Sequence, residues 1–157
     1  MPVANWPTEC RKAPLPGIDD VAVRDGSVLL SVSADPPFLE LRRGRSRTML
    51  STEVPDATGM PVALDPASIE LSDGGAFFVA VPPDGSPGYR VYEATPSSAT
   101  VLFGEGDATV DGLVRFDTRN IDAAPRVSAI DARVVFAAEL SGGAVRNALV
   151  EAQLTPP

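Results

Sequence analysis

One pattern of residues occurs three times in this chain and limits its architecture more than any other feature. Each copy has an aliphatic stretch, an aspartate with a small neighbour, and then a dense apolar run. The aspartates are Asp25, Asp73 and Asp131, and the apolar runs that follow occupy residues 28–30, 77–79 and 134–136. Self-similarity at a period of roughly 20–50 residues is typical of stacked or radial structural units. The repeat therefore predicts an array of like-built β units, and it carries no signature of an activity.

Short extended segments surround each aspartate, and turn residues separate them. An aspartate followed by a glycine or another small residue suits the positive φ angles of a two-residue hairpin turn. The predicted strands are residues 21–23, 28–32, 38–41 and 48–53, then 68–71, 76–81, 89–93 and 100–103, then 126–129, 134–140 and 145–152. Each unit is thus expected to be an antiparallel meander, and the third lacks a fourth strand. Residues 104–124 are expected to form a long surface connector with a short strand at 113–116.

The second strand of each unit is its most apolar segment. It contains Val28-Leu29-Leu30 in the first unit and Phe77-Phe78-Val79 in the second. A strand with one exposed face alternates apolar and polar residues, whereas apolar residues at successive positions indicate that both faces are covered. We therefore expect each unit to be packed between neighbours.

The composition fits one folded domain. The chain has 157 residues, of which 44% are hydrophobic and 22% are charged, and it contains 16 prolines and 13 glycines. This length can bury a core without disulfides or metals, and many prolines and glycines favour turns over long helices. We expect a proline-rich N-terminal segment at residues 1–16 and a β-repeat domain at 17–157, with units at about 17–54, 67–105 and 125–152.

The charge of the chain argues against nucleic acid as a partner. The formal net charge is -8, whereas nucleic-acid affinity comes mainly from basic surfaces. The one basic cluster surrounds Gly44 and consists of Arg42, Arg43, Arg45 and Arg47. A solvated hairpin turn explains this cluster, and contact with an anionic ligand or acidic partner is the alternative.

Neither a membrane insertion nor a compartment can be assigned from the sequence. No run of about 18 apolar residues predicts a membrane span, and the N-terminal residues do not form a signal-peptide pattern. The single cysteine, Cys10, cannot form a disulfide within the chain. The compartment stays open, and an exported parent protein is one alternative.

The residue types available for chemistry are few. The chain has no histidine, which excludes a Ser-His-Asp or Cys-His catalytic arrangement within it. Glu105, Asp107 and Asp111 occupy near-alternate positions of a glycine-containing segment, and such carboxylates could bind a hard cation such as calcium. The segment lacks the order of an EF-hand loop, so an ordinary acidic surface loop is the competing interpretation. No other cofactor is expected.

The third unit resembles a β-propeller blade. The stretch Ser128-Ala129-Ile130-Asp131-Ala132-Arg133-Val134-Val135-Phe136, with Ser141-Gly142-Gly143 after it, is similar to blades of uncharacterised bacterial repeat proteins, which are often exported. The resemblance covers roughly residues 17–152 and implies an all-β, propeller-like array of about three four-stranded antiparallel meanders. A β-sandwich or an irregular barrel is the alternative fold.

The number of units is lower than in a closed propeller, which has four to eight blades. A second copy of the chain, further blades in a longer chain, or sandwich-like packing would each resolve this difference. Propellers serve binding, scaffolding and several unrelated chemistries. The expected function is a noncatalytic binding or scaffold module for a protein or small-molecule ligand. The alternatives are an enzyme domain that uses carboxylates with a divalent metal, and a structural fragment of a larger exported repeat protein.

Overall fold

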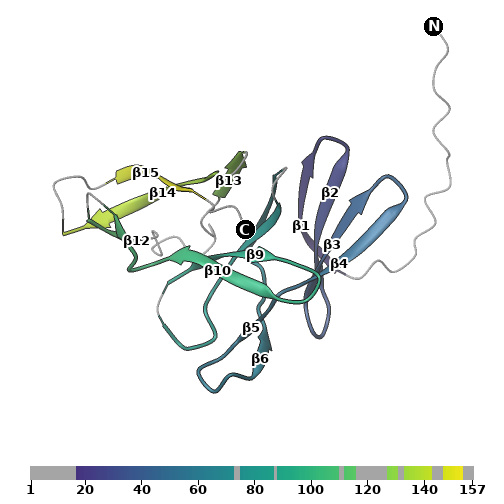
Figure 1. Ribbon diagram of the computed structural model, residues 1–157, viewed down its shortest axis with the longest axis horizontal. Helices are drawn as coiled ribbons and strands as arrows, with labels where there is room; N and C mark the ends of the chain where they lie inside the picture. Colours follow the sequence, from purple (N-terminus) through teal and green to yellow (C-terminus); the bar gives the residue numbers. More distant parts are fainter. Residues whose placement is uncertain are drawn as a thin grey trace, which may run out of the picture.

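The protein is all-β in the computed structural model, which describes residues 17–72, 75–86, 88–109, 112–115, 127–130, 133–142 and 147–153. The segment expected at residues 1–16 lies outside this range. Antiparallel sheets joined by short connections make up the described part of the chain (Figure 1). Within that part, no helix has the length and apolar character needed to cross a bilayer.

Sheet 1 is a four-stranded meander in the order of the sequence. It consists of β1 (Gly17–Arg24), β2 (Ser27–Ser33), β3 (Phe38–Arg43) and β4 (Ser46–Ser51). The turn between β1 and β2 is the predicted one, with Asp25 at φ 46° and Gly26 at φ 74°. Positive φ at both central residues matches the twist of a two-residue hairpin, and an aspartate and a glycine tolerate it best. This local geometry explains why the first copy of the repeat has an aspartate followed by a glycine between its first two strands.

Sheet 2 repeats the meander of sheet 1. It consists of β7 (Ser68–Ser72), β8 (Gly75–Ala80), β9 (Arg90–Ala94) and β10 (Ala99–Gly104). Ser72 pairs with Gly75, just as Arg24 pairs with Ser27 in sheet 1, so a two-residue connection separates the first two strands in both sheets. The second aspartate of the repeat, Asp73, lies outside the described residues. The prediction of two four-stranded meanders is confirmed.

A two-stranded hairpin that the sequence did not predict joins these sheets. It consists of β5 (Glu53–Pro55) and β6 (Pro61–Ala63). Its loop is closed by the Asp56 carboxylate, which accepts hydrogen bonds from the backbone nitrogens of Thr58 at 2.7 Å and Met60 at 3.0 Å. The predicted strand 48–53 is therefore divided: β4 ends at Ser51, and the chain turns into the hairpin.

Sheet 3 has five strands in total, and the longest of them is central. It consists of β11 (Ala108–Thr109), β12 (Gly112–Arg115), β13 (Val127–Ile130), β14 (Arg133–Ser141) and β15 (Asn147–Gln153). β12 and β13 pair with successive parts of one edge of β14, while β15 pairs with the other edge. The connector strand expected near residues 113–116 is thus β12, which pairs with β14 on the same edge as β13. In sheets 1 and 2 the fourth strand instead pairs with the third, so β13, β14 and β15 form a three-stranded meander and β12 is an addition to it. Asp131 lies outside the described residues.

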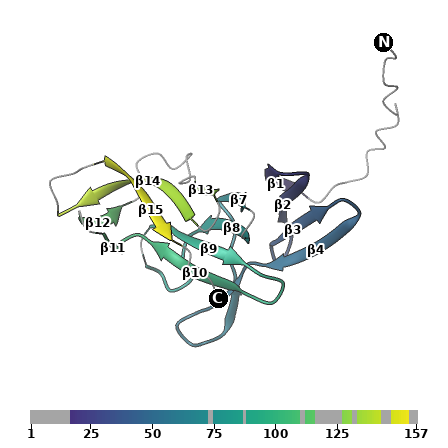
Figure 2. The same ribbon diagram turned by 45° about the horizontal axis from the view of Figure 1, so that its top comes forward.

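The three sheets contact one another in series through β1, β7 and β13, the strands that precede the repeated aspartates. β7 contacts β1 and β2 of sheet 1 and also β13 of sheet 3, so β1, β7 and β13 follow one another in space (Figure 2). Between β1 and β7, the Asp20 carboxylate accepts a hydrogen bond from the Ile69 backbone nitrogen at 3.1 Å. No closed barrel forms among the described strands. This serial arrangement is consistent with a propeller-like or a sandwich fold.

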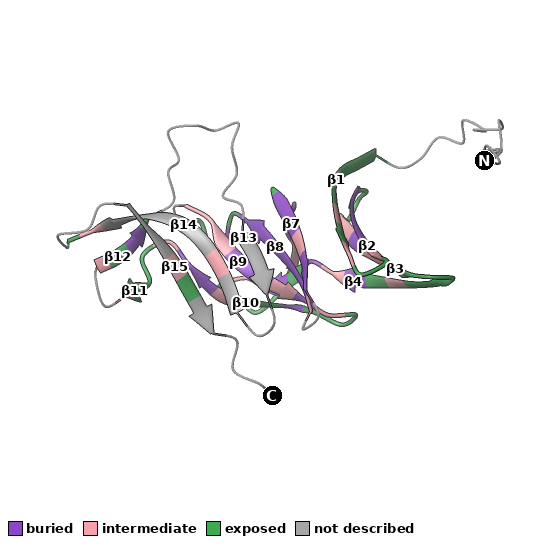
Figure 3. Cartoon of the chain, turned by 90° about the horizontal axis from the view of Figure 1, so that it is seen from above, coloured by how far each residue is buried: buried purple, intermediate pink, exposed green. Residues whose placement is uncertain are grey.

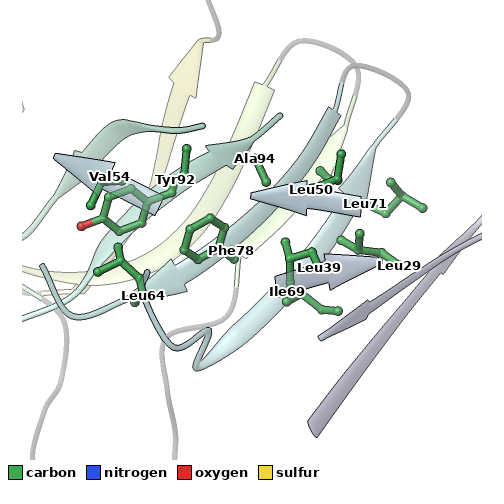
Figure 4. Close-up of a cluster of buried hydrophobic side chains, with 13 residues drawn as sticks. Leu29, Leu39, Leu50, Val54, Leu64, Ile69, Leu71, Phe78, Tyr92 and Ala94 are labelled. Atoms are coloured by element: carbon green, nitrogen blue, oxygen red, sulfur yellow. The ribbon is translucent and has the colours of Figure 1, made fainter. Parts of the chain in front are cut away.

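The main core lies between sheet 1 and sheet 2. Leu29 and Leu39 of sheet 1 face Ile69 and Phe78 of sheet 2, and all four side chains are buried (Figure 4). Successive residues of β8 point to opposite faces, and Phe77 is fully buried on the face away from this core. The prediction that the second strands are covered on both faces is confirmed for β2 and β8.

Candidate functional site

A cavity of about 340 Å³ lies where the β5–β6 hairpin meets sheet 2. Val54 and Pro55 of β5 form one side, and residues of β9, β10 and the loop after β8 form the others. Ligand sites in proteins typically have volumes of about 300–1,000 Å³ and largely apolar walls. The cavity therefore has the size and lining of a site for one small molecule.

Two prolines shape the wall that follows β8. Pro82 is buried and Pro83 half-buried, and both line the cavity. A proline cannot donate a backbone hydrogen bond to a sheet, so this pair ends the strand and directs the chain around the cavity. The turn that follows is held by Asp84, whose carboxylate accepts a hydrogen bond from the Ser86 backbone nitrogen at 2.9 Å.

Tyr92 forms an aromatic wall of the cavity. Its ring is stacked on Phe78, with 5.1 Å between the ring centroids and 17° between the ring planes. Figure 4 shows the Tyr92 ring beside Val54 and Leu64 of the hairpin segment. The side chain is almost wholly buried, and burial raises the pKa of its hydroxyl. Tyr92 therefore stays protonated at neutral pH and presents an apolar ring with a hydrogen-bonding hydroxyl.

Two residues of opposite charge complete the cavity lining. Hydrogen bonds from Ser86 lower the pKa of Asp84, and the nearby positive charge of Arg90 lowers it further. Asp84 is therefore ionised at neutral pH, and Arg90 is always positive. The two charges offset each other, so the cavity offers hydrogen-bond donors and acceptors without a strong net charge.

The carboxylates singled out for calcium lie elsewhere, near β11 and β12. The Glu105 carboxylate is 3.6 Å from the Arg115 guanidinium, and the Asp107 carboxylate accepts a hydrogen bond from the Gly104 backbone nitrogen at 2.8 Å. Asp111 lies outside the described residues. In the ranges that the structure covers, no group of three or more His, Cys, Asp or Glu side chains is placed to hold a metal ion. Calcium binding by Glu105, Asp107 and Asp111 stays a prediction.

The arginine cluster around Gly44 is divided by the strand geometry. Arg42 forms an ion pair with Glu40, with 2.6 Å between Nε and Oε1, and Arg47 lies 3.9 Å from the same oxygen. Arg43 belongs to the opposite face of sheet 1 and lines a small cavity with Arg24. The cluster is thus not a single basic surface.

The cavity between the hairpin and sheet 2 has one local signal in the sequence, the Pro82-Pro83-Asp84-Gly85 stretch after the second strand of unit two. That stretch by itself predicts only a loop. Comparison with protein-family models, with curated proteins and with solved structures gives no match.

Proposed function

We propose that this protein is a noncatalytic, propeller-like binding module whose ligand occupies the cavity between the β5–β6 hairpin and sheet 2. The single observation that supports this most strongly is the composition of the cavity wall. Tyr92, Val54 and the prolines supply an apolar surface, while Asp84 and Arg90 supply polar groups at its margin. Apolar walls with a few polar groups are the usual composition of small-molecule sites.

The state of the polar groups favours binding over catalysis. A general base works best when its pKa is close to the working pH, and the pKa of Asp84 is shifted downward, away from neutrality. Tyr92 has its pKa shifted upward, which keeps its proton in place. Groups in these states are suited to hold and orient a ligand by hydrogen bonds.

The wall chemistry also indicates the class of ligand. The stacked Tyr92 ring and the prolines favour a flat apolar body, because aromatic and apolar surfaces pack well against one another. The offsetting charges of Asp84 and Arg90 favour a neutral polar group over a strongly charged one. We therefore infer a small ligand with a flat apolar body and an uncharged hydrogen-bonding head.

Benzamide is a suitable probe because it combines an aromatic ring with a neutral amide. Titration followed by backbone NMR should shift the amide signals of Asp84 and of residues 90–92. Val101→Trp places a large ring at a half-exposed position of the cavity wall and should abolish these shifts. Tyr92→Phe keeps the stacking ring but removes one hydroxyl, and the loss of one hydrogen bond should weaken binding by about 2- to 10-fold.

Met60→Ala is the matched control, since Met60 is an exposed apolar residue of the same hairpin that does not line the cavity. Its binding should equal that of the unaltered chain. Shifts that persist in Val101→Trp, or that fall on strands remote from the cavity, would refute the proposed site. Circular dichroism of each variant verifies that the sheets are retained.

A further inference from the structure

The outer face of sheet 1 carries large apolar side chains in contact with solvent. We name this the open face of sheet 1; by strand register its exposed apolar residues are Ile18, Val21 and Val23 of β1 and Met49 of β4, on either side of the buried Leu30 of β2. Val21 is 50% exposed, Val23 is 68% exposed and Met49 is 63% exposed. In Figure 3 most of β1 is exposed or half-buried, whereas most of β7 is buried. The core that sheet 1 shares with sheet 2 lies on its other face, so the β1 and β4 edges of the open face have no second sheet packed on them among the described residues.

Sheet 2 shows what covers the same face when a neighbour is present. Counting from the equivalent two-residue turns, Val21 corresponds to Ile69 and Val23 corresponds to Leu71. Ile69 is 7% exposed and Leu71 is 2% exposed, because both belong to the core that packs on sheet 1. The face of sheet 2 that corresponds to the open face of sheet 1 is thus covered, and sheet 1 is the four-stranded sheet that covers it.

Sheet 3 is open on the opposite face of the repeat. Val135 of β14 corresponds by the same register to Leu29 in β2 and Phe77 in β8, which are both fully buried. Val135 is only half-buried, and Leu113, which shares its face through pairing of β12 with β14, is 43% exposed. We name this the outer face of sheet 3. Sheet 1 and sheet 3 are the two ends of the series of sheets. The faces that they expose correspond to the two faces that pack together where sheet 1 meets sheet 2.

Each face carries one charge that is complementary to a charge on the other, while Arg115 on the outer face of sheet 3 is paired with Glu105 of its own chain at 3.6 Å. Arg47 lies two residues from Met49 on the open face of sheet 1, and its side chain is 72% exposed. Glu151 pairs with Val135 across β14 and β15, and it is exposed on the outer face of sheet 3. Opposite charges beside apolar centres favour association of these faces and set its register.

We propose that two copies of this chain form a closed dimer, in which the open face of sheet 1 in each copy packs on the outer face of sheet 3 in the other. A twofold axis makes both contacts identical, so the assembly ends at two copies and covers both ends of each array. The result is a ring of six sheets, within the four to eight of closed propellers. The dimer does not depend on the proposed ligand, because the residues of these two faces do not line the cavity.

Light scattering after size-exclusion chromatography tests the dimer on the full chain. The expected mass is twice 16.4 kDa. Val23→Asp places a charge on the open face of sheet 1, and Leu113→Asp places one on the outer face of sheet 3. Each variant alone should be a monomer. Met60→Asp is the control: it alters an apolar residue that is 63% exposed but belongs to neither face, and it should remain a dimer.

Mixing the two variants tests the head-to-tail geometry. A dimer of one Val23→Asp chain and one Leu113→Asp chain has both substitutions in the same contact, which leaves the second contact intact. Equimolar mixing should therefore restore dimers that neither variant forms alone. A second measurement uses charge: Arg47→Glu or Glu151→Arg should each weaken the dimer by about two- to fivefold, and the double variant should recover the original affinity.

Three results would overturn the proposal. The first is that the unaltered chain is a monomer, whether or not residues 1–16 protect the β1 amides from hydrogen exchange. Leu113→Asp alone could remain a dimer, which would assign the contact to two copies of the open face of sheet 1. The mixture of variants could stay monomeric although circular dichroism shows both variants to be folded.

Discussion

The two adjacent phenylalanines of β8 give the sharpest test of how sheet 2 is packed. Phe77 and Phe78 point to opposite faces of the sheet, and both are fully buried. Truncation of a buried phenylalanine to alanine costs about 3–5 kcal/mol. Phe77→Ala and Phe78→Ala should each destabilise the chain by that amount, because each side chain fills a different interface.

Phe78 should be the more costly of the two. It also loses its stacked partner Tyr92, and such an aromatic pair contributes about 0.5–1.5 kcal/mol beyond the buried area. Small domains have unfolding free energies of about 5–15 kcal/mol, so either variant removes a large share of the total. With a urea slope of about 2 kcal/mol/M, the unfolding midpoint should fall by roughly 2 M.

Urea unfolding monitored by far-ultraviolet circular dichroism measures both values. Phe77→Leu and Phe78→Leu provide milder changes if an alanine variant does not fold, and the Phe78 variant should again be the more costly of the two because it loses the stacking on Tyr92. A cost below about 1 kcal/mol for one of the alanine variants would show that its face is not covered. That outcome would refute the packing of sheet 2 between two neighbours.

Two further predictions concern single polar side chains. The Ser31 hydroxyl is buried on the core face of β2 without a hydrogen-bond partner among the described residues, and the corresponding residue of β8 is Val79. Ser31→Val should therefore raise the unfolding free energy by about 1 kcal/mol. Urea titration measures this change, and a loss of stability would contradict the prediction. Hydrogen bonds from Thr58 and Met60 lower the pKa of Asp56 below 3.8, so its contribution to stability is present above that pH and is lost as the pH falls through the folded pKa. The melting temperature of Asp56→Asn should therefore fall less steeply below pH 4 than that of the unaltered chain. An equal fall of the melting temperature with pH in both chains would contradict a stabilising role of the Asp56 carboxylate.

The features that could be predicted from the sequence are those with local causes. The turn at Asp25 and Gly26 follows from the backbone angles that these two residues tolerate, independently of the rest of the chain. Burial of Phe77 and Phe78 on opposite faces follows from the strand period of two. Both inferences need only a few consecutive residues, and both are confirmed.

The features that could not be predicted depend on distant residues. Pro55 and Pro61 lie in β5 and β6, yet prolines weaken any strand prediction, and pairing across the loop is needed to form the hairpin. Pairing of Arg115 with Glu139 makes β12 part of sheet 3, and no local pattern indicates that partner. The cavity requires the hairpin and Tyr92 to meet, so it becomes visible only once the sheets are packed.

The central claim is that the three sheets follow one another through β1, β7 and β13. Nuclear Overhauser spectroscopy of the isotopically labelled chain tests it directly. We expect contacts from β7 to β1 on one side and to β13 on the other, together with methyl contacts between Ile69 and Leu29 or Leu39. If β7 contacts only one of its two neighbours, the serial arrangement of the sheets is wrong.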